Sequence, residues 1–240
     1  MSNQNDLHFE EIMANRGFHH LYQPLYVLSS WKLLGYEALL RSSFFQDPES
    51  LFHLSMEKNR LYELETGSVI KAVSSFTLEP TNKLFLNIYP STAIHPSFHL
   101  LLDHLPYPHH NIVFEINEGE LIQDPKLLRS AVNRMKEKGY TIAIDDFGKG
   151  ETSLSTALYL EPSFVKLDRY FATDLASSEN KKKIIRILID IFQKKKIKII
   201  LEGIEKPVDL AIAKALGVDI GQGYLLGMPK PISEIHGTRS

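Results

Sequence analysis

The sequence predicts an α/β fold, a closed (β/α)8 TIM-type barrel with an antiparallel first strand. Short apolar segments rich in Val, Ile, Phe and Tyr alternate with helical patterns about eight times. The chain has 240 residues, close to the roughly 250 typical of such barrels. The first two strand segments are joined by the link SSW, which is too short for a helical crossover, so they should form a hairpin. An open doubly wound sheet is the alternative architecture.

The expected strands are apolar segments bounded by turn residues or helix signals. In chain order they cover residues 20–28, 32–40, 83–90, 111–118, 140–147, 163–169, 196–204 and 219–227. Four helices between them carry recognisable end signals. The first helix begins at Asp124 and Pro125 and ends at Gly139, and the second begins at Thr152 or Ser153 and ends before Pro162. Ser177 or Ser178 can cap the third, ENKKKIIRILIDIFQKKK, and the fourth has Pro207 in its first turn and ends at Gly217.

The composition is that of an ordinary globular protein and excludes several function classes. Apolar residues make up 43% and charged residues 23%, with a net charge of −2, so no DNA or RNA duplex is expected as a partner. The absence of cysteine excludes disulfides and thiolate metal sites. The start of the chain has no signal-peptide pattern and no apolar run approaches a membrane span. We therefore expect a cytoplasmic protein without a membrane partner.

Polar residues recur at the ends of the expected strands. In a (β/α)8 barrel the carboxyl ends of the strands meet at one mouth, where the active site lies. These residues should therefore face a common site. They are Glu37 and Arg41; Asn87; Glu115 and Glu118; Asp145 and Asp146; Lys166 and Asp168; Glu202 and Glu205; and Gln222.

Such a set suits divalent metal chemistry. Carboxylate and amide oxygens are hard ligands that favour Mg²⁺ or Mn²⁺. There are enough of them for two cations roughly 3.5–4 Å apart, an arrangement that promotes in-line displacement at phosphorus. The adjacent Asp145 and Asp146 repel one another unless cations offset their charge. We expect Asp145 to end its strand and bind or bridge the cations, and Asp146 to begin the loop and bind the second cation.

Each residue also has a purely structural interpretation. A strand-end carboxylate is commonly solvated or caps a helix, as Asp145 and Asp146 could. Asp168 could pair with Lys166 or Arg169. Arg41 could be a surface ion-pair partner. The repeated placement at strand ends favours a functional site over these alternatives.

Seven blocks of the sequence resemble the motifs of one family. They are YQPLYVLSSWKLLGYEALLR, with Glu37-Ala38-Leu39 and then Arg41; LFLNIYPS; FEINE; IAIDDFGKG; FVKLD; LEGIE; and GQGYLLGMPKP. In this order they resemble the EAL domain family, the phosphodiesterases of cyclic di-GMP. The resemblance runs from about Phe18 to Pro231. We therefore expect an N-terminal extension at 1–17, the domain at 18–232 and a tail at 233–240.

The resemblance implies hydrolysis of cyclic di-GMP to linear pGpG, which lowers the level of this second messenger. It implies a two-metal site for Mg²⁺ or Mn²⁺ and a homodimer. Ca²⁺ should bind and inhibit, because it prefers longer bonds and more ligands. By motif match the metal ligands are Glu37, Asn87, Glu115, Asp145, Asp146 and Glu202. The catalytic residues are Lys166, which holds or deprotonates the water, with Glu37 and Asp145. The substrate-binding residues are Gln23, Leu39, Arg41, Asp168, Glu205 and Gln222, and Glu118 anchors the loop after the fifth strand.

That loop departs from the family pattern D-D-F-G-T-G-Y-S-S-L. Lys149, Glu151 and Thr152 stand where the family has threonine, an aromatic residue and serine. Gly148 and Gly150 are kept, so the turn can form. The change bears on how the loop packs, and so on how dimerisation tunes activity.

A catalytically silent receptor for cyclic di-GMP, or a protein-interaction domain, is the alternative function. Relatives of that kind usually lose acidic ligands. This chain keeps them, and its other departures, Tyr89 and Asn117, remove none. The sequence therefore favours the enzyme.

Overall fold

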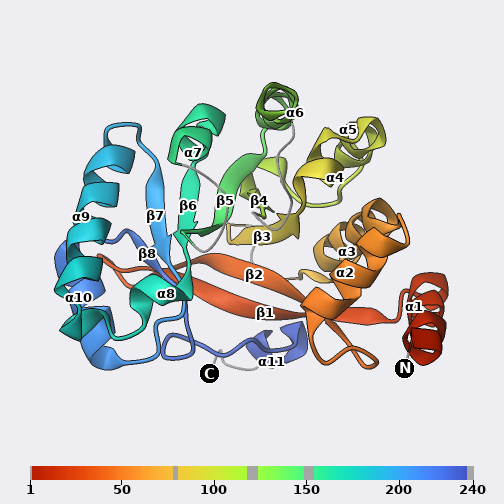
Figure 1. Cartoon of the computed structure of the whole chain (residues 1–240), viewed down its shortest axis with the longest axis horizontal. Helices are drawn as coiled ribbons and strands as arrows, with labels where there is room; N and C mark the ends of the chain where they lie inside the picture. The colour runs from red at the N-terminus through yellow and green to blue at the C-terminus, as the bar shows by residue number, and fades with distance from the viewer. Residues whose placement is uncertain (1, 78–80, 118–123, 149–153, 237–240) are drawn as a thin grey trace.

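The protein folds as a closed eight-stranded barrel surrounded by helices (Figure 1). The computed structural model describes residues 2–77, 81–117, 124–148 and 154–236. The strands follow one another around the barrel in chain order. They are β1 (Phe18–Val27), β2 (Lys32–Ser42), β3 (Lys83–Ile88), β4 (Ile112–Ile116), β5 (Thr141–Phe147), β6 (Phe164–Leu167), β7 (Lys198–Leu201) and β8 (Ile220–Gly221).

The first strand runs against its neighbours, as the short link predicts. β1 pairs antiparallel with β2 and, through Tyr26 and Val27, antiparallel with β8. All other pairs are parallel. The predicted barrel is confirmed, and the open sheet is excluded because β8 closes onto β1.

The helices lie outside the barrel (Figure 1). They are α1 (Ser2–Asn15), α2 (Pro48–Glu57), α3 (Leu61–Ser75), α4 (Pro90–Ile94), α5 (Pro96–Leu102), α6 (Pro125–Glu137), α7 (Leu154–Leu160), α8 (Arg169–Ala172), α9 (Glu179–Gln193), α10 (Pro207–Leu216) and α11 (Ile232–His236), with short 3-10 turns at His109–Asn111 and Leu175–Ser177.

Most of the predicted helix ends are confirmed. The Asp124 carboxylate accepts from two backbone N–H groups in the first turn of α6, and Ser178 caps α9. Gly217 ends α10 in the left-handed conformation with φ of +90°. α7 stops before Pro162 as expected. The expected caps Thr152 and Ser153 lie outside the described residues.

Two features differ from the sequence expectations. The last two strands are shorter than predicted: β7 ends before Gly203, where φ is +69°, and β8 ends before Gly223, where φ is +155°. Residues 2–15 form helix α1, which the sequence analysis did not predict. Phe9 and Ile12 of α1 are fully buried in a cluster with Phe18 and Leu40, so the helix packs on the ends of β1 and β2.

The alternation of side chains along each strand determines which residues face the barrel interior. One layer of apolar side chains fills the barrel interior: Leu25, Phe85, Val113, Ala143, Phe164, Ile200 and Ile220. Residues two apart on a strand share a face. Two positions further toward the mouth, on the same strands or directly after them, stand Gln23, Asn87, Glu115, Asp145, Lys166, Glu202 and Gln222. The polar residues therefore form the next layer of the barrel, directly above an apolar floor.

Candidate metal centre

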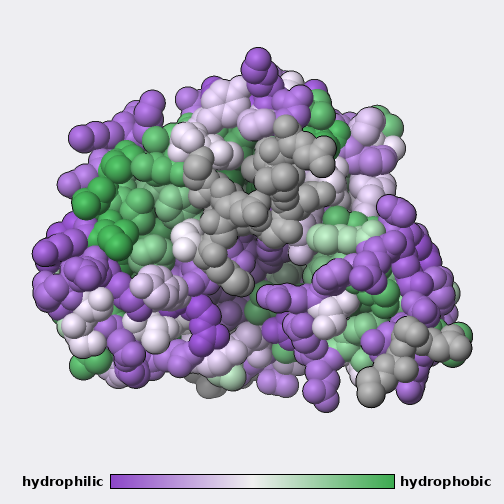
Figure 2. Space-filling view, viewed as in Figure 1, coloured by the Kyte–Doolittle hydropathy of each residue, from purple (hydrophilic) through white to green (hydrophobic). Residues whose placement is uncertain are grey.

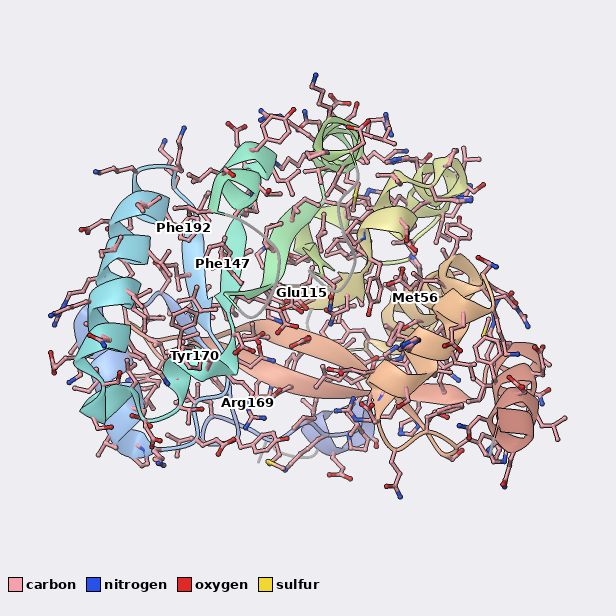
Figure 3. The ribbon with its side chains drawn as sticks, viewed as in Figure 1. Met56, Glu115, Phe147, Arg169, Tyr170 and Phe192 are labelled. Atoms are coloured by element: carbon pink, nitrogen blue, oxygen red, sulfur yellow. The ribbon has the colours of Figure 1, made fainter. Side chains whose placement is uncertain are left out.

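A buried lysine lies at the centre of this polar layer. The Lys166 side chain is 1% exposed, and its Nζ contacts four carboxylates, three from other strands and one from the residue directly after β7. The distances are 2.6 Å to Glu202 Oε1, 2.9 Å to Glu115 Oε1, 3.0 Å to Asp145 Oδ1 and 3.3 Å to Glu37 Oε2. The sequence predicted these residues at one mouth but not the direct contact of the lysine with four acids. Figure 3 shows Glu115 in the middle of the barrel.

Burial and charge act together on these groups. Burial lowers the pKa of Lys166, but the charges of Asp145, Glu115, Glu202 and Glu37 raise it more, so it lies well above its ordinary value. Burial raises the pKa of Glu115 well above the usual range, and it raises the pKa of Glu202 to about 8 against the opposing charge of Lys166. Packing four acids around a single ammonium group is therefore costly, and further positive charge would stabilise the site.

A β-bulge brings the two adjacent aspartates to the same site. Ile144 pairs with Val165 and Phe147 with Leu167, so Asp145 and Asp146 together oppose the single residue Lys166. Asp146 has a left-handed φ of +54°, which aspartate tolerates better than most residues. The expectation that the strand ends at Asp145 is wrong, because β5 continues through the bulge to Phe147. The bulge allows neighbouring residues to share one side of the strand.

Amide side chains hold Glu37 in place. Asn87 Nδ2 donates to Glu37 Oε1 at 2.8 Å, and Gln222 Nε2 donates to Glu37 Oε2 at 2.7 Å. Gln222 Nε2 also donates to Gln23 Oε1 at 3.2 Å, and Gln23 donates to the carbonyl of Gly227 at 3.1 Å. Burial raises the pKa of Glu37, but Lys166 and these amide bonds outweigh it and keep the pKa below its usual value. Glu37 is therefore an ionised carboxylate with a fixed orientation.

The carboxylates form two groups that could each hold a metal ion. Glu37, Glu115 and Asp145 offer oxygens within 4.8 Å of one another, and so do Asp145, Asp146 and Glu202. Asp145 belongs to both groups, as a bridging ligand would. Glu115 is fully buried, and its Oε2 has no hydrogen-bond partner in the described part of the chain. An all-oxygen donor set with an unsatisfied buried oxygen fits a hard divalent cation.

The centre opens into a cavity of about 300 Å³. Figure 2 shows hydrophilic residues around a hollow in the middle of this face. Leu39 and Glu49 are shared with a second cavity of about 290 Å³, which contains Arg41 and the ring pair Phe52 and Tyr89. Arg41 lies in this second cavity and does not line the first, and its Nη1 donates to the carbonyl of Leu40 at 2.8 Å. Arg41 and the carboxylates Glu37, Asp145 and Glu202 thus line different cavities, which share Leu39 and Glu49.

The other predicted residues take different positions. Asp168 lines the first cavity, and its Oδ1 accepts from the backbone N–H of Tyr170 at 2.8 Å, which caps α8. In the described part of the chain Asp168 forms no ion pair with Lys166 or Arg169. Glu205 lines the same cavity. The expected loop anchor, Glu118, lies outside the described residues.

Some cavity residues were not predicted. Arg169, Gly203, Gly223 and Tyr224 line the first cavity, as does the exposed Glu49. Arg169 directly follows the strand-end residue Asp168, which is a signal that could have identified it. The altered loop positions Lys149, Glu151 and Thr152 also lie outside the described residues.

Comparison with known families decides the classification. The model of the EAL domain matches residues 7–229, nearly the whole chain. The chain belongs to the EAL domain family. Its match to the cyclic di-GMP phosphodiesterase RocR of Pseudomonas aeruginosa is 29% identical over 232 residues, covering 91% of this chain and 59% of RocR. The cyclic di-GMP phosphodiesterase PdeA of Borreliella burgdorferi is 33% identical over 190 residues, covering 76% of this chain and 28% of PdeA.

Solved structures agree with this fold. The EAL enzyme Bd1971, in a form bound to cAMP and cyclic di-GMP, superimposes on the EAL domain with a TM-score of 0.87 at 24% identity, covering 97% of this chain and 68% of that one. The chain spans less than two thirds of the length of the curated relatives named above. In the described part of the chain, no helix combines the length and apolar character needed to cross a membrane.

Proposed function

We propose that this EAL domain is a metal-dependent phosphodiesterase that hydrolyses cyclic di-GMP to linear pGpG. The observation that carries the proposal is the pair of carboxylate groups that share Asp145 and lie open to a cavity. The names of its relatives point to the same substrate. In the reaction a water oxygen bonds to phosphorus, one P–O3′ bond breaks, and the released 3′ oxygen takes up a proton.

The proposed metal ligands divide into two sets around the bridging Asp145. Glu37, Asn87 and Glu115 would hold one cation, and Asp146 and Glu202 the other. Two Mg²⁺ or Mn²⁺ ions bound there would activate water and stabilise the oxygens of the in-line displacement. The amide bonds from Asn87 and Gln222 would keep Glu37 oriented without a rearrangement during the reaction.

Lys166 would position the attacking water. Its Nζ lies within 3.3 Å of four carboxylates, so a water among these groups would be within its donating distance. The apolar floor that includes Phe85 and Ile200 excludes solvent from below, so water reaches the site from the mouth.

The substrate is larger than either cavity, and we place it across both. Its reacting phosphate would lie at the carboxylates, and Leu39 would separate the two halves. Arg41, in the second cavity, would hold substrate there through its guanidinium group. Gln23, Asp168, Glu205 and Gln222 would contact the half in the first cavity. The homodimer remains a prediction, which light scattering at several protein concentrations would test.

A turnover assay tests the proposal. Purified protein with Mg²⁺ or Mn²⁺ should convert cyclic di-GMP to pGpG, as measured by chromatography, and a metal chelator should stop the reaction. A folded protein that releases no pGpG with either cation would overturn the enzyme. Calorimetry then separates the two alternative functions. A catalytically silent receptor would bind cyclic di-GMP without releasing product, whereas a protein-interaction domain would neither bind nor cleave it.

A further inference from the structure

The first cavity holds an arginine that the proposed chemistry does not use. Arg169 is exposed at the start of α8 and lines the cavity beside Asp168. In the described part of the chain its guanidinium group forms no ion pair and no hydrogen bond, although several carboxylates line the same cavity. Figure 3 shows Arg169 near Tyr170, where β6 passes into α8. An unpaired guanidinium group at a cavity wall is available to a bound molecule.

Two glycines fix the position of this arginine. A Cβ atom on Gly203 would lie 2.5 Å from the Cβ of Arg169, and one on Gly223 would lie 2.2 Å from the backbone of Ile204. A larger residue at either position would push the segments apart. The close approach places Arg169 against the turn after β7, where Gly203 lies between the carboxylates Glu202 and Glu205 in the chain. Gly203 and Gly223 therefore line the β6–β8 side of the cavity.

The side chains beside these two glycines suit a guanine base better than a phosphate group. Guanine offers N–H donors to a carboxylate such as Glu205, and its O6 and N7 accept two hydrogen bonds from one guanidinium group. Tyr224, which is 57% exposed, offers an aromatic face on the same side. A phosphate group beside Arg169 would face the charges of Asp168 and Glu205, and the other cation lining this cavity, Lys166, is already in contact with four carboxylates.

The second arginine lies across the barrel. Arg41 lies near the end of β2 and Arg169 follows β6, four strands apart in a closed ring of eight. Each lines a different cavity. A substrate with two guanine bases would thus meet one guanidinium group on each side of the metal centre.

We propose that Arg169 is a specificity-determining residue that donates to O6 and N7 of one guanine of cyclic di-GMP. The inference rests on the proposed function, because it needs that substrate in the first cavity. It adds a contact at the β6 side that orients one half of the substrate. The contact reads the base and takes no part in bond breaking.

The test compares three variants with two substrates. R169A removes the guanidinium group, R169K keeps a charge without the two-pronged donor, and R186A removes an exposed arginine on α9 as the matched control. The substrates are cyclic di-GMP and its bis-7-deazaguanine analogue, which lacks the N7 acceptor. Equilibrium binding in a metal chelator is measured beside KM and kcat with Mn²⁺.

With cyclic di-GMP, R169A should raise Kd and KM by about five- to 150-fold, the range of a bidentate arginine–guanine pair, while kcat changes by less than about twofold. R169K should lose most of the same affinity, and R186A none. With the 7-deaza analogue the difference between wild type and R169A should shrink. Equal Kd values for wild type and R169A, or an equal loss with both substrates, would overturn the role of Arg169 while leaving the enzyme intact. A wild-type protein that neither binds nor cleaves cyclic di-GMP would overturn both.

Discussion

Nζ of Lys166 lies 2.6 Å from Oε1 of Glu202, which directly follows the neighbouring strand β7; Lys166 is buried, whereas the Glu202 side chain is 18% exposed at the barrel mouth. Three further carboxylates contact the same nitrogen. The ammonium group is therefore the counter-charge of the whole acidic cluster. Two consequences follow, one for stability and one for metal binding.

Replacing Lys166 by Met should destabilise the metal-free protein by about 3–5 kcal/mol, because it leaves buried carboxylates without a cation. Mn²⁺ should raise the free energy of unfolding of K166M by more than it raises that of wild type, because the cations offset the repulsion between the carboxylates that Lys166 no longer neutralises. Urea unfolding with and without Mn²⁺ measures both effects. K195M, at an exposed lysine, is the control. A K166M protein as stable as wild type in a chelator would contradict the account.

The buried His20 should give the protein a pH-dependent stability. Burial lowers its pKa from 6.5 to about 3, and Lys71, His19 and Arg41 add to the shift, while its Nε2 contacts Ser68 Oγ at 2.9 Å. As the pH falls below 6.5 the unfolded chain takes up the proton first, so stability present above pH 6.5 is lost progressively toward pH 3.

Between pH 7.5 and pH 5 this loss should amount to about 2 kcal/mol, from roughly 1.4 kcal/mol per pH unit. H20N should lack this part of the pH dependence, whereas H53N, at an exposed histidine, should retain it. Urea midpoints of the three proteins at both pH values provide the comparison. Parallel pH profiles for wild type and H20N would show that His20 is not the source.

Calcium should bind the carboxylates and fail to support turnover. Ca²⁺ prefers longer bonds and more ligands than Mg²⁺ or Mn²⁺, so it would misplace the water and phosphate relative to Lys166. Adding Ca²⁺ to a Mn²⁺ assay should lower the rate, and excess Mn²⁺ should restore it. Full pGpG release with Ca²⁺ as the sole cation would refute this prediction.

The sequence predicts the barrel and its mouth because both follow from short-range patterns. Alternating apolar segments and helix signals define the elements, and the period of two within strands places Asn87, Glu115 and Lys166 on the inner face. The short SSW link predicts the antiparallel first strand. These features depend on residues close together in the chain.

Other features depend on contacts between distant segments and could not be predicted. The bulge at Asp145 and Asp146 exists because β5 pairs with β6 around Lys166. The early end of β8 follows from the approach of Gly223 to the backbone of Ile204. The place of Arg41 in a second cavity depends on how α2 and α3 pack over β2.

The bulge gives the two aspartates different expected roles. The N–H of Asp146 donates to Asp145 Oδ1 at 2.9 Å, and Asp145 belongs to both carboxylate groups whereas Asp146 belongs to one. D145N should therefore abolish metal binding at the first site. D146N should spare that site and still abolish turnover, because a single cation cannot stabilise both the attacking and the leaving oxygen.

Mn²⁺ stoichiometry, measured by calorimetry beside pGpG release for wild type, D145N and D146N, tests the two-cation centre most directly. Wild type should bind two Mn²⁺ ions and release pGpG. D146N should retain one tightly bound ion without turnover, and D145N should lose the first-site ion and turnover together. If both variants keep wild-type stoichiometry and release pGpG at the wild-type rate, the aspartates serve only the local backbone and the proposed metal centre is wrong.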